Sequence, residues 1–197
     1  MKGLAFVFVV AFLFLSCGSK EDPVAFWVER LEGLYKPGFE GKLMFARHEL
    51  SREEYDLVRR ELIKRDPIYF ALLPDEEKSE EGLAIWAIRE TGHDLMGYIP
   101  IPSRTEEMFM AAVEVSPRGL MCGGPEGTIT DRVLMNLTTH HPFHGLQRIP
   151  KDRRTPEMCR IAVTKDPKAG MWVPEGVLSP EELKDLGYVD PCDRFNP

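Results

Sequence analysis

Three histidines in one short segment are the residues of this chain best suited to bind a metal ion. His140, His141 and His144 stand at adjacent and i, i+4 spacing, from which imidazole nitrogens can converge on zinc. Pro142 interrupts the segment, however, and no His-Glu-x-x-His sequence, nearby cysteine or pair of carboxylates accompanies it. We therefore expect these histidines to be polar residues at an exposed loop edge, and a metal site is the alternative.

No other segment has the pattern of a catalytic site. The glycine-rich residues 123–127 lack the Lys-Ser/Thr ending of a phosphate-binding loop, and the chain has no Gly-x-Ser-x-Gly elbow. The net charge of -7 argues against a nucleic-acid partner, because such proteins cluster Lys and Arg to neutralise phosphates. We predict a protein that is not an enzyme, needs no cofactor and binds no nucleic acid.

The cysteines do not form a disulfide framework. Cys17 belongs to the N-terminal segment, which leaves Cys122, Cys159 and Cys192, an odd number without Cys-x-x-Cys spacing. Cys159 occupies an apolar position and is expected in the core. A disulfide between Cys122 and Cys192 stays open for an oxidising compartment, although it would have to cross more than two sequence repeats.

A period of about 25 residues predicts the elements that position these side chains. Prolines recur at this interval, and each is followed five positions later by a hydroxyl residue. The five pairs are Pro74 with Ser79, Pro100 with Thr105, Pro125 with Thr130, Pro150 with Thr155, and Pro174 with Ser179. A Ser or Thr oxygen accepts hydrogen bonds from the free amides of a first helical turn, which acids and proline also favour. Each hydroxyl residue is therefore predicted to be the N-cap of a helix.

The residues three, four and seven positions after each hydroxyl form an apolar stripe at helical spacing, interrupted only by Glu182. A second proline or glycine then ends each helix, at Pro67, Gly92, Pro117, Pro142 and Pro167. The residues that follow are sufficient for one short helix. The predicted fold is thus all-α: tandem helical repeats, α-solenoid-like, with one longer and one short helix in each unit of about 25 residues.

The repeat domain is predicted to extend over residues 42–190. A helix over 51–65, capped by Ser51, is interpreted as a degenerate first repeat, which gives about six units. Residues 18–41 are predicted to be a linker with an N-terminal capping helix, for which Asp22 is the expected N-cap. Residues 191–197 are predicted to be an irregular tail.

Residues 1–17 have the composition of an export signal. Lys2 precedes the apolar run 4–15, which is shorter than the roughly 20 residues that a transmembrane helix needs. Its ending, Leu15-Ser16-Cys17, resembles the lipobox of bacterial lipoproteins, with Phe14 where that family usually has leucine. The resemblance implies that Cys17 is acylated.

An acylated Cys17 would anchor the protein to a lipid bilayer in the bacterial cell envelope. The alternative is an ordinary signal peptide cut after Gly18 or Ser19, which would give a freely secreted protein.

The repeat pattern resembles that of uncharacterised bacterial helical-repeat families. It reads Ile-Pro, then Arg-Thr-x-Glu-Met, then Ala-Val, in both 99–113 and 149–163. It is similar, less closely, to the leucine-rich repeat variant, which alternates long and short helices. The resemblance implies a helical-repeat domain and carries over no active-site residue.

The predicted function is that of a membrane-anchored scaffold that binds a protein or peptide. The residues expected to line its binding surface are Tyr98, Arg104, Arg154 and Trp172, which lie near the junctions between units. The alternative is a metal-binding or enzymatic envelope lipoprotein that uses the segment from His140 to His144. A structural spacer that binds nothing is a third possibility.

Overall fold

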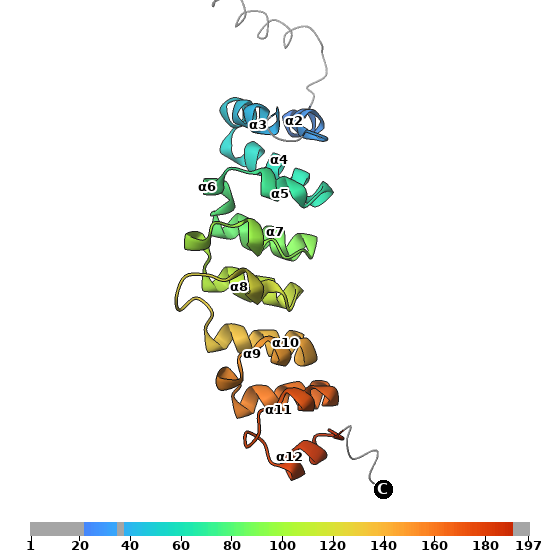
Figure 1. The fold of residues 1–197 in the computed structure, drawn as a ribbon. Coiled ribbons are helices and arrows are strands. Elements are labelled where there is room, and N and C mark those ends of the chain that lie inside the picture. The colour runs from blue at the N-terminus through green and yellow to red at the C-terminus, as the bar shows by residue number, and fades with distance from the viewer. Residues whose placement is uncertain (1–21, 35–37, 191–197) are drawn as a thin grey trace, which may run out of the picture. The chain divides into compact units, whose positions relative to one another are not determined.

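A computed structural model describes residues 22–34 and 38–190 (Figure 1). These residues form helices joined by short connections, and none of them belongs to a strand. The predicted all-α class is therefore confirmed. The described residues divide into two compact units, one ending at Leu62 and the other beginning at Ile63.

The first unit contains α2 (Pro23–Leu31), α3 (Gly38–Glu49) and most of α4 (Arg52–Arg65). The Asp22 carboxylate accepts a hydrogen bond from the Val24 amide at 2.9 Å, which confirms the predicted N-cap. Ser51 caps α4 as predicted, and it does so reciprocally with Glu54: each side chain accepts from the other residue's backbone amide.

Helix α3 departs from the prediction, which places residues 38–41 in a linker. Phe39 and Leu43 are buried on one side of this helix. Their burial outweighs the low helix propensity of Gly38 and Gly41, since two large apolar side chains contribute more than two glycines cost.

The second unit contains four longer helices: α7 (Glu81–Thr91), α8 (Glu106–Val115), α9 (Asp131–His140) and α11 (Pro156–Lys165). The hydroxyls of Thr105, Thr130 and Thr155 accept from the backbone amide three residues later, so the N-caps of α8, α9 and α11 are confirmed. Ser179 likewise caps α12 (Pro180–Asp185), in a capping box with Glu182. We call α7, α8, α9 and α11 the long helices.

The predicted N-cap at Ser79 is wrong. An additional turn of helix, α6 (Asp75–Lys78), follows Pro74, and the Ser79 hydroxyl donates to the Asp75 carbonyl at 2.6 Å. Asp75 is the first of three consecutive acids, which favour a helix start directly after the proline. The hydroxyl is therefore used to end α6, and α7 begins after Glu80 without a side-chain cap.

Shorter helices return the chain from one long helix to the next. They are α5 (Ile68–Leu72), η1 (Met96–Tyr98), η2 (Ile101–Ser103), η3 (Gly119–Cys122), α10 (Pro142–Arg148), η4 (Lys151–Arg153) and η5 (Pro167–Trp172). We call η1, η3, α10 and η5 the short elements. Side chains before three of them accept hydrogen bonds that the repeat pattern does not predict: Asp94, Ser116 and Asp166 each accept from the amide two residues later, and Asp166 is the N-cap of η5.

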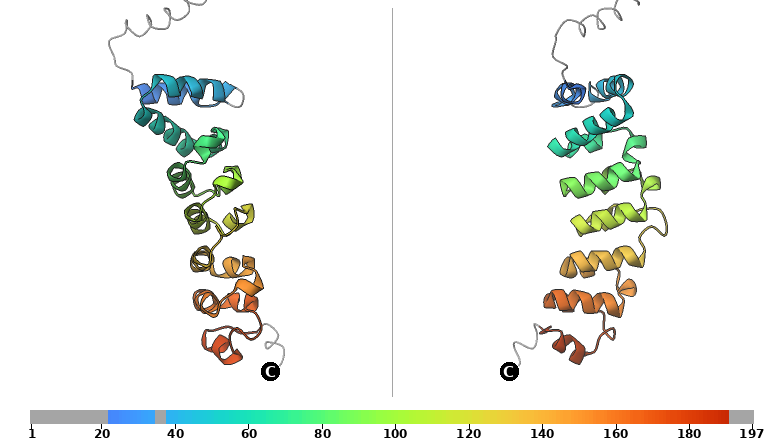
Figure 2. Two further views of the ribbon diagram at one scale, coloured as in Figure 1. Left: turned by 90° about the vertical axis from the view of Figure 1, so that its left-hand side faces the viewer. Right: turned by 180° about the vertical axis from the view of Figure 1, so that it is seen from behind.

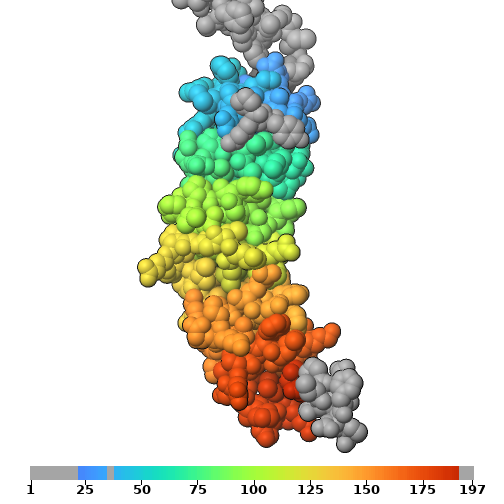
Figure 3. All heavy atoms as spheres, viewed as in Figure 1, coloured from blue at the N-terminus to red at the C-terminus, as the bar shows by residue number. Residues whose placement is uncertain are grey.

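The long helices and the short elements form two columns (Figure 2). Helix α7 packs against α8, α8 against α9, and α9 against α11. Glycine permits close approach between the columns: a Cβ at Gly119 would lie 2.9 Å from Ala112, and one at Gly145 would lie 2.8 Å from the Leu137 carbonyl oxygen. Within the second unit, the space-filling view shows the residues of successive elements as consecutive bands in contact (Figure 3).

The core of the second unit lies along the apolar stripe that the sequence predicts. Its buried members are Met108, Phe109, Ala112, Val133, Leu134, Leu137, Met158, Cys159 and Ala162. The expected burial of Cys159 is thus confirmed. Within the described residues, no helix combines the length and the apolar composition that crossing a bilayer requires.

Polar side chains fix the register between consecutive long helices. The Thr105 hydroxyl donates to Glu81 at 2.5 Å, and the Thr130 hydroxyl donates to Glu106 at 2.8 Å, each across a sequence separation of 24 residues. Further bonds between neighbouring helices are Arg89 to Glu114, Arg132 to Glu107, Asn136 to the Met110 carbonyl and Lys165 to the Thr139 carbonyl. The N-cap threonines therefore tie one helix start to the previous one.

Candidate functional site

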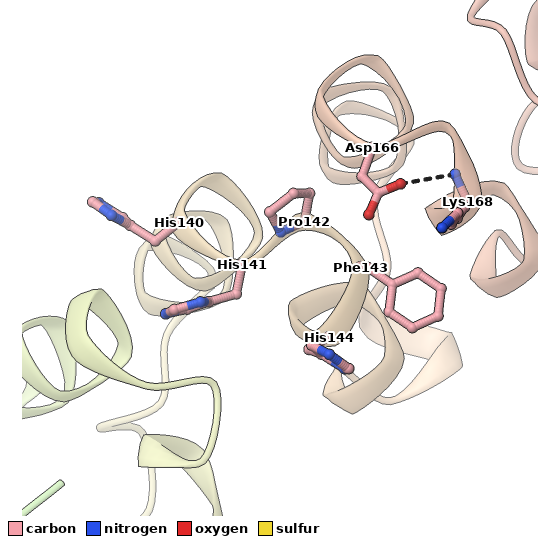
Figure 4. A pocket seen from close by; sticks show the side chains of 7 residues that line it. All are labelled: His140, His141, Pro142, Phe143, His144, Asp166 and Lys168. Atoms are coloured by element: carbon pink, nitrogen blue, oxygen red, sulfur yellow. Dashed lines mark hydrogen bonds between the residues drawn. The ribbon is translucent and has the colours of Figure 1, made fainter. Parts of the chain in front are cut away.

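His140, His141 and His144, expected at an exposed loop edge with a metal site as the alternative, lie at the corner between α9 and α10. His140 is the last residue of α9, His141 joins the two helices, and His144 lies in α10. Figure 4 shows that the rings do not converge, since His140 and His144 point away from one another. Across residues 22–34 and 38–190, no three His, Cys, Asp or Glu side chains are placed to hold a metal ion.

An open cavity of about 460 Å³ lies beside this corner (Figure 4). It is lined by residues 140–144 together with Asp166 and Lys168. The Asp166 carboxylate is engaged as the cap of η5, because it accepts from the Lys168 amide at 3.0 Å. The Phe143 ring makes edge contacts with His144 and Trp172, at centroid distances of 5.1 and 6.0 Å. The cavity therefore offers an aromatic wall and a cation, and its one carboxylate already has a partner.

His141 is the histidine with a distinctive environment. Its Nε2 atom is buried without a hydrogen-bond partner among the described residues. Burial lowers the pKa of His141 below its ordinary value, and the neighbouring His140 and His144 lower it further. Hydrogen bonds to the backbone of Glu114 and Val113 act in the opposite direction. Burial therefore favours the neutral form of this imidazole, which lies between α8 and the α9–α10 corner.

Arg104 and Arg154 are buried, with 6% and 9% of their surface exposed. Arg104 Nε donates to the Ile99 carbonyl at 3.0 Å, and its Nη1 donates to the carbonyls of Cys122 and Gly123. Arg154 makes the equivalent bonds 50 residues later, from Nε to the Ile149 carbonyl at 2.8 Å and from Nη1 to the Trp172 carbonyl. Burial lowers the pKa of Arg154.

These contacts correct the prediction that Arg104 and Arg154 line a binding surface. Their guanidinium groups donate to backbone carbonyls at the ends of η3 and η5, so they hold these short elements in place. Sequence spacing places both residues at a junction between units, and it gives no sign that the acceptors are carbonyls 18 residues downstream. The other two predicted surface residues remain candidates: Tyr98 is 46% exposed, and Trp172 is partly exposed.

The short elements carry the exposed apolar side chains of the two columns. Tyr98 on η1, Met121 on η3 and Met171 on η5 are exposed by 46%, 70% and 52%, whereas α7, α8, α9 and α11 expose no large apolar side chain. Element η1 packs against η3, Arg148 of α10 donates to the Met121 sulfur at 2.9 Å, and α10 packs against η5. We call the exposed side chains of these four elements the short-element face.

This face was not predicted from the repeat pattern. The available signal is that Met121 and Met171 occupy positions outside the predicted apolar stripe, where a soluble helical domain has little reason to place methionine.

The two described cysteines are free thiols. Cys159 is buried and Cys122 is partly exposed, and burial raises the pKa of both. Cys17 and Cys192 lie outside the described residues, so acylation of Cys17 and a disulfide between Cys122 and Cys192 stay predictions. Neither described thiol has the lowered pKa of a reactive cysteine.

Comparisons of the chain with models of protein families, with curated proteins and with solved structures find no match. The function must therefore be argued from this chain's own residues and geometry.

Replacing Arg154 by Met should lower the free energy of unfolding by about 2–4 kcal/mol, because the buried carbonyls of Ile149 and Trp172 lose a charged donor. The stability of Arg154→Lys should lie between those of the native protein and Arg154→Met, since one ammonium group cannot make the several directed hydrogen bonds of a guanidinium group. The measurement is urea-induced unfolding followed by circular dichroism. Arg160→Met, on the exposed side of α11, is the control and should cost no more than about 0.5 kcal/mol. Equal losses for the two methionine variants would show that the buried arginine has no special role.

Lowering the pH from about 7.5 to about 5.5 should reduce the free energy of unfolding of the native protein by more than it reduces that of a His141→Gln variant. The folded-state pKa of His141 is depressed, so the unfolded chain takes up a proton first as the pH falls, and stability is lost through this range. The measurement is the free energy of unfolding at both pH values. His48→Gln, at an exposed position of α3, should keep the native pH dependence. The interpretation fails if His141→Gln keeps it as well.

Proposed function

We propose that this protein is a lipid-anchored scaffold of a bacterial cell envelope, built from tandem helical repeats, that binds a protein or peptide partner. The observation that carries the proposal is the short-element face, which presents Tyr98, Met121 and Met171 to solvent on η1, η3 and η5. Exposed apolar side chains gathered on one side of a domain are typical of a surface that binds another macromolecule.

The repeat arrangement is supported by interactions that recur with the sequence period. Thr105 and Thr130 bind the carboxylate 24 residues earlier, and Arg104 and Arg154 bind carbonyls five residues before and 18 residues after themselves. Equivalent side chains at equivalent positions favour units that stack on one another, as in helical-repeat proteins, which commonly bind ligands along an extended surface.

The alternative of a metal-binding or enzymatic lipoprotein has weaker support. The histidines of the α9–α10 corner do not converge, and the nearby Asp166 carboxylate serves as a backbone cap. Burial favours the neutral form of His141, but its Nε2 atom is buried, which removes that nitrogen from solvent. The scaffold is therefore the function that this geometry favours.

The membrane anchor rests on the lipobox-like sequence at Cys17. If Cys17 is acylated, cells grown with labelled palmitate should yield labelled protein in the membrane fraction, and Cys17→Ser should abolish both the label and the membrane association. The measurement is autoradiography of fractionated cells, with Cys122→Ser as the matched control that keeps the label. An unlabelled protein whose N-terminus begins at Lys20 would instead establish free secretion.

The binding function can be tested by site-specific photocrosslinking in intact envelopes. A photoreactive side chain placed at Met121 or Met171 should give adducts with a discrete partner, because both positions are exposed on the short-element face. The same group at Arg132, which is on the long helix α9 and is paired with Glu107, should give few or none. The adducts would be detected by immunoblot and mass spectrometry. No adduct at either methionine position would favour the structural spacer.

A further inference from the structure

The short elements contain no acidic residue, although the chain carries a net charge of -7. Elements η1, η3, α10 and η5 instead include Arg148 and Lys168, and Arg118 directly precedes η3. The side chains of Arg118 and Lys168 are exposed. Charge is therefore distributed unequally between the two columns, with cations on the side that also exposes apolar groups.

Two acids that precede short elements accept hydrogen bonds from backbone amides. Asp94 accepts from the Met96 amide at 3.2 Å, and Asp166 accepts from the Lys168 amide at 3.0 Å. The exposed acids Glu126 and Asp152 lie in the connections that follow η3 and α10, outside the short elements themselves. The carboxylates of Asp94 and Asp166 are thus already engaged by backbone amides at the starts of η1 and η5.

The long helices α7 and α8 carry more acids than bases, and several of their carboxylates are occupied. Glu114 pairs with Arg89, Glu107 pairs with Arg132, and Glu106 accepts from Thr130. A basic partner would have to displace these bonds to bind the three carboxylates. An acidic partner, in contrast, meets the exposed cations Arg118 and Lys168 on this side, which favours its encounter and orientation there.

The shape and spacing of the face indicate what kind of acidic partner fits. Exposed apolar groups recur on η1, η3 and η5, with cations between them, and methionine adapts to varied apolar partners. Near η5, Lys168 and Phe143 line the same cavity of about 460 Å³, which is large enough to take an apolar side chain next to a carboxylate. A partner that contacts all these elements must be extended along the column.

We infer that the short-element face binds an extended acidic polypeptide segment that also carries apolar side chains. This inference rests on the proposed scaffold function and specifies the partner's chemistry. An anionic membrane surface fits less well, because such surfaces are typically bound by clusters of four to eight Lys or Arg residues, whereas the short elements offer Arg148 and Lys168, with Arg118 directly before η3.

The test uses the full chain with Cys17→Ser, so that no acyl group is present, and four sets of fluorescent peptides of about 12 residues. The sets are acidic with apolar residues, basic with apolar residues, neutral with apolar residues, and acidic without apolar residues. Fluorescence anisotropy at low salt should show the tightest binding for the acidic, apolar set. Raising the salt should weaken this binding, because exposed charges are screened. Vesicles containing phosphatidylglycerol test the membrane as an occupant.

Variants of the face should weaken binding of the acidic, apolar set. Lys168→Glu should reduce affinity about five- to tenfold by placing like charge beside the peptide. A double variant, Met121→Gln with Met171→Gln, should reduce it about tenfold by removing apolar contacts. The matched controls are Lys184→Glu on α12 and Met44→Gln on α3, which are also exposed and should keep the native affinity. Unchanged thermal melting would show that each variant remains folded.

The outcomes separate this inference from the scaffold function. Tight binding of the basic or neutral set, or insensitivity to the Lys168 and methionine variants, would overturn the acidic docking surface while leaving a peptide-binding scaffold. Vesicle binding that depends on Lys168, without peptide binding, would replace the polypeptide by a membrane. If no peptide set and no vesicle binds, and photocrosslinking gives no adduct, both proposals fail.

Discussion

Two buried guanidinium groups determine where the short elements of the second unit lie. Arg104 joins the carbonyl of Ile99 to those that end η3, and Arg154 joins the carbonyl of Ile149 to the one that ends η5. Buried carbonyls at the end of a short helix have no intrahelical donor. The hydrogen bonds that a charged side chain makes to several of them therefore offset the cost of burying its charge. The exposed face formed by these elements therefore depends on interactions that are themselves hidden.

The parts of the fold that follow local rules were predictable from sequence. A hydroxyl residue followed by acids or proline caps α8, α9, α11 and α12, because the bond that defines the cap reaches only three residues along the chain. The same rule fails at Ser79, where the acids after Pro74 start a helix five residues early. Helix α3 was not predicted because its glycines lower the helix propensity of the segment. The free energy gained by burying Phe39 outweighs that effect.

The candidate site was harder to predict because its determinants are nonlocal. The acceptors of Arg104 and Arg154 are backbone atoms, which every residue type supplies, so no sequence pattern marks them. Both arginines looked like surface cations at a junction, and both are structural. Tyr98 belongs to η1, which ends just before the Ile99 carbonyl that Arg104 binds, and Trp172 ends η5, where Arg154 binds its carbonyl. The exposed face extends from these residues through Met121 on η3 and Met171 on η5.

The unit that begins at Pro125 has no arginine at the position that Arg104 and Arg154 occupy in their units. Ile129 occupies the position of Arg104, and Arg153 of the following unit donates to the Ile129 carbonyl at 2.9 Å and to the Asp131 carboxylate at 2.7 Å. Arg153 is partly exposed, whereas Arg104 and Arg154 are buried. Exposed ion pairs contribute less to stability than buried, fully hydrogen-bonded charges do. The junction between η3 and α10 is therefore held by weaker contacts, among them the bond from Arg148 to the Met121 sulfur. Since a ligand stabilises whatever it binds in the folded state, a peptide spanning η3 and α10 would reinforce the junction that the repeat itself holds least firmly.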